Sequence, residues 1–143
     1  MWLVPALLVN WPNVISSGET DLPVHIVDWM PTLCYLADFE PNRPLPWDGQ
    51  NIWPIIDGSN TQPSDRILYW KTRRASAVRR GDWKLIVSNK ENRSELFDLK
   101  NDPHETNNLA DEESGHRQEL RASLTQVASK DRQGTGNVLA APE

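Results

Sequence analysis

One cysteine and three histidines are the side chains of this sequence that most readily perform nucleophilic or acid–base chemistry. A catalytic cysteine needs an activating base or a recognisable motif beside it. Cys34 instead has a leucine and a tyrosine as neighbours, and we interpret it as a small buried core residue. His25, His104 and His116 do not share the spacing of metal ligands. The last two are most simply interpreted as solvated, whereas His25 either lines a pocket or makes local hydrogen bonds.

The charged residues give no catalytic pattern either. The carboxylates form no dense metal-binding run, and no glycine-rich phosphate loop is present. The stretches DGQN and NDPHE resemble pieces of calcium loops, but the spacing of an EF-hand and its closing glutamate are missing. Basic residues concentrate in one stretch, as Lys71, Arg73, Arg74, Arg79 and Arg80. This group is either a solvated hairpin or a rim that attracts an anionic substrate.

The composition is that of a globular chain. Its 143 residues can bury one core, and they are 38% hydrophobic and 24% charged. A net charge of −5 argues against nucleic-acid binding. A single cysteine excludes an intrachain disulfide and a multi-cysteine zinc site. The opening MWLVPALLVNW is too short to span a bilayer and lacks the basic start of a signal peptide, so no membrane or targeting segment is expected.

The first half of the chain predicts a strand and short helices. Residues 3–11 are nearly all apolar, which is typical of a strand buried on both faces, yet no comparable run offers it neighbours. The run is either a helix segment or the start of a chain taken from the middle of a larger fold, and we favour the second. Asp28 is expected to cap a short amphipathic helix that has Pro31 in its first turn. A proline-rich loop follows, and then one or two helical turns that end at Gly58.

The second half predicts an antiparallel sheet covered by a helix. Residues 66–70, 75–80, 83–88 and 95–99 are strand candidates separated by turn signals. Asp102 and Pro103 are expected to begin a helical region, with an amphipathic helix over about 111–128 that packs on one face of the sheet. The fold class is therefore α+β, and the tail over 131–143 is expected to be disordered.

Five stretches resemble, in order and spacing, the C-terminal third of a sulfatase: VPALLVNWPNVISSG, PVHIVDWMPTLCYLA, WDGQNIWPIIDG, AVRRGDWKLI and ELFDLKNDPHETNNLA. The stretches HIVDWMPTL and DGQNIWPII are most similar to sequences of the arylsulfatase B-like branch. Sulfatases resemble alkaline phosphatases in having a large mixed sheet between helices, followed by a small antiparallel subdomain. The resemblance implies that residues 1–65 are a remnant of that large α/β domain and residues 66–130 are the C-terminal subdomain.

The resemblance also implies that the reacting groups lie outside this chain. Sulfatases use a cysteine in a C-x-P/A-x-R motif, converted to formylglycine, together with calcium. Cys34 has no Pro or Ala two positions on and no Arg four positions on, so it does not match. No residue here matches a catalytic or metal position, and calcium and formylglycine would belong to a missing N-terminal part. The chain is thus expected to be the C-terminal part of an arylsulfatase-like sulfuric ester hydrolase, inactive alone.

Within such an enzyme, we expect four residues to shape the rim of the substrate pocket: His25, Trp70, Arg73 and Arg74. The alternatives are a free-standing binding module and a partner subunit that recognises sulfated glycans. The expected partners are a sulfated substrate, through the full-length enzyme, and a second copy through the exposed N-terminal apolar strand. The resemblance suggests a periplasmic, extracellular or lysosomal location.

Overall fold

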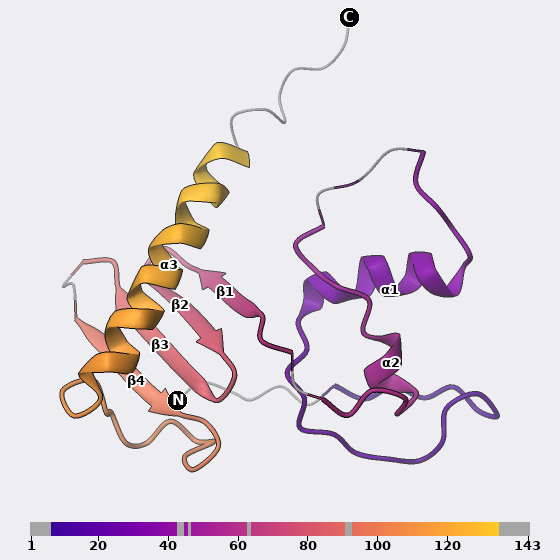
Figure 1. The fold of residues 1–143 in the computed structure, drawn as a ribbon, viewed down its shortest axis with the longest axis horizontal. Helices are drawn as coiled ribbons and strands as arrows, with labels where there is room; N and C mark the ends of the chain where they lie inside the picture. The colour runs from indigo at the N-terminus through magenta and orange to yellow at the C-terminus, as the bar shows by residue number, and fades with distance from the viewer. Residues whose placement is uncertain (1–6, 43–44, 46, 63, 91–92, 135–143) are drawn as a thin grey trace, which may run out of the picture. The chain divides into compact units, whose positions relative to one another are not determined.

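The computed structural model describes residues 7–42, 45, 47–62, 64–90 and 93–134 (Figure 1). Contacts divide the chain into two compact units, with Pro5–Ser64 in one and the residues from Asp65 onward in the other. Each unit has its own local architecture. The assignment of residues 1–65 to a larger α/β domain stays a prediction, and the tail over 135–143 lies outside the described residues.

The described residues of the first unit form three short helical elements. The 3-10 helix η1 (Ile26–Asp28) leads directly into α1 (Trp29–Leu36), and α2 (Trp53–Ile56) follows a long irregular segment. Pro31 lies in the first turn of α1, where its missing N–H breaks no helical hydrogen bond. Gly58 follows α2 with φ +78°, a left-handed conformation that ends a helix and that glycine adopts without strain. Both predicted helical stretches of this unit are confirmed.

The predicted strand over residues 3–11 is wrong over the part that the structure describes. Residues 7–11 have no regular structure, and Leu8 is 90% exposed. Trp11 makes an edge contact with Trp53, their ring centroids 5.8 Å apart. A strand needs neighbours to accept its backbone hydrogen bonds, and the described residues of this unit contain no other strand. The start of the run, residues 3–6, lies outside the described residues.

Helix α1 forms where it was expected, with Asp28 at its N-cap position, but the Asp28 side chain makes no capping hydrogen bond to it. The helix also buries a different side. Leu33 is 52% exposed, although an amphipathic helix would place it on the buried apolar face, and Met30 and Tyr35 are 55% and 60% exposed. Thr32 is instead completely buried. Within its own unit, α1 therefore packs through a polar residue and leaves an apolar surface uncovered.

The second unit is built on a four-stranded antiparallel sheet, as predicted. Its strands are β1 (Ile67–Lys71), β2 (Ala75–Arg80), β3 (Trp83–Ser88) and β4 (Ser94–Asp98), and they pair in sequence order. Gly81, at φ +57°, forms the short turn between β2 and β3, where two-residue hairpins need positive φ. In the register, Val78 lies opposite both Tyr69 and Leu85, and Leu85 lies opposite Leu96.

Helix α3 (Ser114–Gly134) lies across one face of this sheet (Figure 1). Its side chains complete the main core, which contains Val78, Leu85, Leu96, Ala110, Leu120 and Leu124. The other face carries a smaller apolar cluster, Ala77, Ile86 and Phe97. The predicted packing is confirmed, but the helix begins later and ends later than expected. Pro103 is not at a first helical position, and 131–134 are helical rather than disordered.

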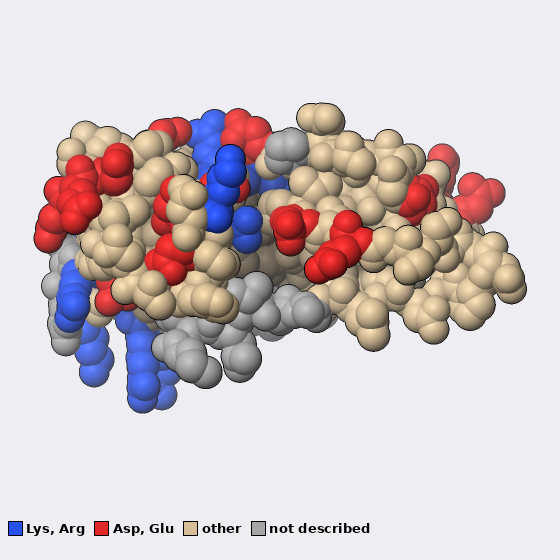
Figure 2. Space-filling view, turned by 90° about the horizontal axis from the view of Figure 1, so that it is seen from below, with Lys and Arg blue, Asp and Glu red and all other residues tan. Residues whose placement is uncertain are grey.

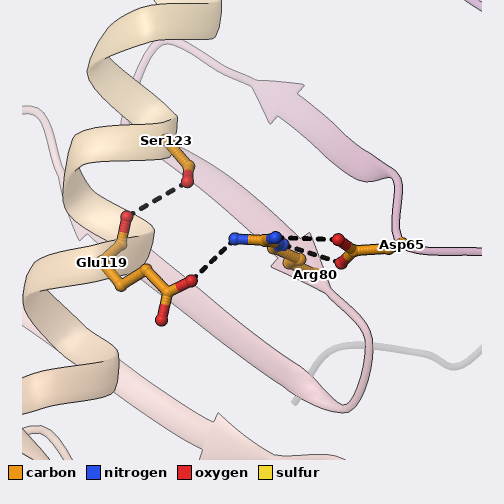
Figure 3. Close-up of polar contacts among 4 residues, drawn as sticks. All are labelled: Asp65, Arg80, Glu119 and Ser123. Atoms are coloured by element: carbon orange, nitrogen blue, oxygen red, sulfur yellow. Dashed lines mark hydrogen bonds and ion pairs between the residues drawn. The ribbon is translucent and has the colours of Figure 1, made fainter.

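Arg80 connects three parts of the second unit (Figure 3). Its Nε and one terminal nitrogen donate to the two carboxylate oxygens of Asp65, both at 2.8 Å, and the other donates to Glu119 on α3 at 2.7 Å. The hydrogen bond and the charge of Arg80 lower the pKa of Asp65. Since these side chains are largely exposed, the contacts orient β2 and α3 more than they stabilise them.

Candidate functional site

Asp28 and Thr32 hold the segment before α2 against the first two helical elements. Both side chains are fully buried. Asp28 accepts from the backbone N–H groups of Gln50 at 3.0 Å and His25 at 2.6 Å. Thr32 Oγ1 accepts from the backbone N–H of Ile52 at 2.9 Å and donates to the carbonyl of Asp28 at 2.6 Å. Buried polar groups are tolerated when they are hydrogen-bonded in this way, so these two side chains act as structural links.

Gly49 lets the same segment approach η1 closely. A Cβ atom built at this position would lie 2.1 Å from the carbonyl oxygen of Val27 and 2.8 Å from the backbone nitrogen of Asp28. No side chain fits there unless the backbone moves. The DGQN stretch is therefore a packing motif in this structure, in place of the piece of calcium loop that it resembles.

His25 makes the local hydrogen bonds that were one of its two expected roles. It is the N-cap of η1, and its Nδ1 accepts from the backbone N–H of Val27 at 3.3 Å. Together with Asp28 it forms a capping box. The His25 side chain accepts from the backbone N–H of Asp28, and the Asp28 side chain accepts from the backbone N–H of His25. Its place on a substrate rim stays a prediction.

Lys84 and Glu105 join the GDWKL and DPHE motifs. Lys84 Nζ lies 2.5 Å from Glu105 Oε1, and the two side chains are only 14% and 7% exposed. Glu105 adopts φ 56°, an uncommon conformation for a residue with a side chain. Its Oε2 is buried and has no hydrogen-bond partner in the described part of the chain. The turn after β4 is thus held over the sheet by one largely buried ion pair.

Arg79 belongs to the same polar group. It lies directly opposite Lys84 in the β2–β3 register, and its Nε donates to the carbonyl of Gly81 at 2.9 Å. Burial lowers the pKa of Arg79, and the charges of Asp82 and Glu105 oppose this effect. Like charges directly opposite one another destabilise a strand pair, so Glu105 offsets a repulsion as well as pairing with Lys84.

Asp102 and Asn108 organise the rest of the DPHE turn. Asp102 accepts from the backbone N–H groups of Asn107 at 2.8 Å and Thr106 at 2.7 Å, and these bonds, that from Asn107 foremost, lower its pKa. Asn108 Oδ1 accepts from the backbone N–H of Leu96 at 3.0 Å. Asp102 therefore caps a turn, whereas the sequence predicted that it caps a helix.

The described residues contain no group of three or more His, Cys, Asp or Glu side chains placed to hold a metal ion. Cys34 is half-buried in α1 and does not have the predicted core position. His116, expected to be solvated, stacks on Trp83 with ring centroids 4.0 Å apart. Over the same described residues, no helix is long and apolar enough to cross a membrane.

The β1–β2 turn and the end of β3 share a set of hydrogen bonds. Asn89, at the end of β3, donates through its backbone N–H to the carbonyl of Arg74 at 2.8 Å and through Nδ2 to that of Thr72 at 3.0 Å. The β1–β2 turn and the end of β3 are thereby joined at one end of the sheet, which we call the basic turn end. Its exposed cationic residues are Lys71, Arg73, Arg74, Lys90 and Arg93.

Of the four predicted rim residues, Arg73 and Arg74 lie on this turn end and Trp70 lies in the adjoining strand, 37% exposed. His25 belongs to the first unit, and a joint role of all four stays a prediction. Sequence reasoning missed Lys90 and Arg93, because they are distant in sequence from Arg73. The signal was present, since alternate turns of an antiparallel meander emerge at the same end. The remaining basic residues, Arg79 and Arg80, are engaged in contacts within the sheet and with α3.

Residues 3–133 match the family model described as N-sulphoglucosamine sulphohydrolase, C-terminal. Among curated relatives, the chain is 28% identical over 116 residues to N-acetylglucosamine-6-O-sulfatase of Bacteroides thetaiotaomicron, covering 72% of this chain and 20% of that protein. It is 34% identical over 116 residues to choline-sulfatase of Rhizobium meliloti, covering 76% of this chain and 22% of that protein. The chain thus spans about a fifth of the length of these relatives.

Solved structures have the same fold. A putative sulfatase from Bacteroides thetaiotaomicron is 25% identical with a TM-score of 0.61, covering 81% of this chain and 27% of that one. The structure of Ps i-CgsB in complex with k-i-k-neocarrahexaose is 22% identical with a TM-score of 0.69, covering 81% and 27%. These matches identify the family and not a branch within it, so the assignment to the arylsulfatase B-like branch stays a prediction. The chain belongs to the sulfatase C-terminal family, as its five motifs predicted.

Proposed function

We propose that this chain is the C-terminal region of an enzyme that hydrolyses sulfate esters of saccharides, and that it supplies structure and pocket rim to that enzyme. The family match over residues 3–133 carries this proposal. The names of the relatives support the substrate class, since one is an N-acetylglucosamine-6-O-sulfatase. The motif residues support the structural role, because Asp28, Thr32, Lys84 and Glu105 are occupied in internal contacts.

The reacting groups would lie elsewhere in the enzyme. Hydrolysis of a sulfate ester needs an activated nucleophile, positive charge for the sulfate oxygens and an acid for the leaving group. The arginines of this region can bind a sulfate, but equal binding of the ground state and the transition state does not accelerate the reaction. Calcium and formylglycine would accordingly be held by residues outside this region.

The apolar surface of the first unit is where this region would pack against the rest of the enzyme. It comprises exposed side chains of η1, of α1 and of the loop that follows α1: Ile26, Met30, Leu33, Tyr35 and Phe39. An uncovered surface of this kind marks a contact with another protein part. In the isolated chain the same surface, with the exposed Leu7 and Leu8, would drive self-association.

Assays of an aryl sulfate ester test the proposal. The full-length gene product is expected to release the phenol in a calcium-dependent reaction, and the isolated chain is expected to show only the buffer rate. Cys34→Ala should leave both results unchanged. Turnover by the isolated chain that Cys34→Ala abolishes would contradict the proposed division of roles. Failure of the full-length product on aryl and saccharide sulfate esters would contradict the proposed activity.

A further inference from the structure

The cations of the sheet fall into two groups that differ in their partners. Those within the sheet are engaged: Arg80 with Asp65 and Glu119, and Lys84 with Glu105. At the basic turn end, Arg73, Arg74 and Lys90 make no ion pair with any residue that the structure describes. Arg93 has only a long contact of 4.0 Å with Glu95.

This end of the sheet is positively charged in a chain whose net charge is −5. Glu91 is part of the same sequence stretch and lies outside the described residues. Figure 2 shows lysine and arginine side chains projecting in neighbouring groups from one border of the molecule. Exposed like charges repel one another, and a bound polyanion would remove that repulsion.

The backbone of the turn end is fixed before any ligand arrives. Thr72 Oγ1 accepts from the backbone N–H groups of Arg74 at 3.2 Å and Ala75 at 3.0 Å, and donates to the carbonyl of Ala75 at 2.9 Å. Asn89 ties the end of β3 to the same turn, and its Oδ1 accepts from Ser76 Oγ at 3.3 Å. A preorganised turn loses little conformational entropy on binding.

We propose that the basic turn end is a binding site for a sulfated saccharide. Arg73, Arg74 and Lys90 would bind the sulfate groups, since charge-assisted hydrogen bonds to oxyanions are the strong ones and arginine donates two in parallel. Trp70, one residue before the end of β1, offers an aromatic surface for a sugar ring. That the ligand is a saccharide rests on the proposed function. That it is a polyanion rests on the charge and the geometry of the turn end alone.

Calorimetric titration of the chain with a heparin-derived hexasaccharide tests the site, with the desulfated hexasaccharide as the matched ligand. The sulfated probe is expected to bind, more weakly as salt rises, and the desulfated probe is not. Arg73→Gln combined with Arg74→Gln should weaken binding about tenfold, which corresponds to about 1.4 kcal/mol, because two exposed charge-assisted contacts are lost. These side chains are exposed, so the melting temperature should not change.

The control variant combines Lys100→Gln with Lys130→Gln, which removes the same charge from exposed positions outside the turn end. It should bind like the parent chain. Equal weakening by both variants, equal binding of the desulfated probe, or no binding of the sulfated probe would each overturn the proposal. Tighter binding of a single-stranded RNA or of phosphatidylserine vesicles would also overturn it. Binding in a protein whose full-length form hydrolyses no sulfate ester would contradict the proposed function and leave this site standing.

Discussion

Replacing Glu105 by glutamine tests whether the ion pair with Lys84 holds the DPHE turn over the sheet. The substitution keeps the size of the side chain and removes its charge. Lys84 is 14% exposed and lies opposite Arg79, so the substitution leaves two neighbouring cations in a largely buried position without their carboxylate. Removing one partner of a buried pair costs about 3 kcal/mol or more. We expect the free energy of unfolding of the second unit to fall by about 3 kcal/mol.

Urea unfolding followed by tryptophan fluorescence measures this loss, since Trp83 precedes Lys84 in β3 and packs against the main core of this unit. A double-mutant cycle then isolates the interaction. Its three variants are Lys84→Met, Glu105→Leu and their combination. Lys84→Met removes the buried cation, and the combination replaces the pair by apolar groups, which should recover most of the lost stability. A loss below about 1 kcal/mol for Glu105→Gln, with a coupling energy within about 0.5 kcal/mol of zero, would refute the reasoning.

Three further expectations concern other contacts. Gly49→Ala should destabilise the first unit by about 2 kcal/mol or more, since its Cβ would lie 2.1 Å from the Val27 carbonyl oxygen, whereas an alanine at the open Gly18 should not. Asp102→Asn should be less stable than the parent at neutral pH. Because the folded-state pKa of Asp102 lies below 3.8, its contribution is present above that pH, and the gap should close as acid titration passes below it. Met30→Glu with Leu33→Glu should reduce self-association measured by light scattering without changing the circular dichroism. Unchanged association would show that another surface is responsible.

The strands were predictable because each carries its own local signal. Val78, Leu85 and Leu96 recur within short stretches bounded by turn residues, and an alternating pattern directly encodes one buried face. The helix that covers this face was predictable for the same reason, from Leu120 and Leu124. Its start was not, because the residues between Asp102 and Ser114 are ordered by the side chain of Asp102 and by side-chain contacts to the sheet.

The side-chain contacts that hold distant segments together were not predictable, since each depends on residues far apart in the sequence. Thr32 and Ile52 are 20 positions apart, and Lys84 and Glu105 are 21 apart. No periodicity reports such a pairing. Helical spacing would bury Leu33, whereas the structure buries Thr32, because the hydrogen-bonded hydroxyl of Thr32 links α1 to the segment before α2. The resemblance identified these residues as belonging to motifs, and only the fold explains why they occur together.

The order of the elements along the chain has a consequence for synthesis. The four strands pair with their immediate successors, so the sheet can close as soon as β4 has left the ribosome. Helix α3 follows it, and until Leu120 and Leu124 emerge, one apolar face of the nascent sheet faces water. During that interval the sheet is open to chaperones and to other nascent chains. A stop codon placed before Ser114 would make the interval permanent, and the shortened product would be expected in the insoluble or degraded fraction of the cell.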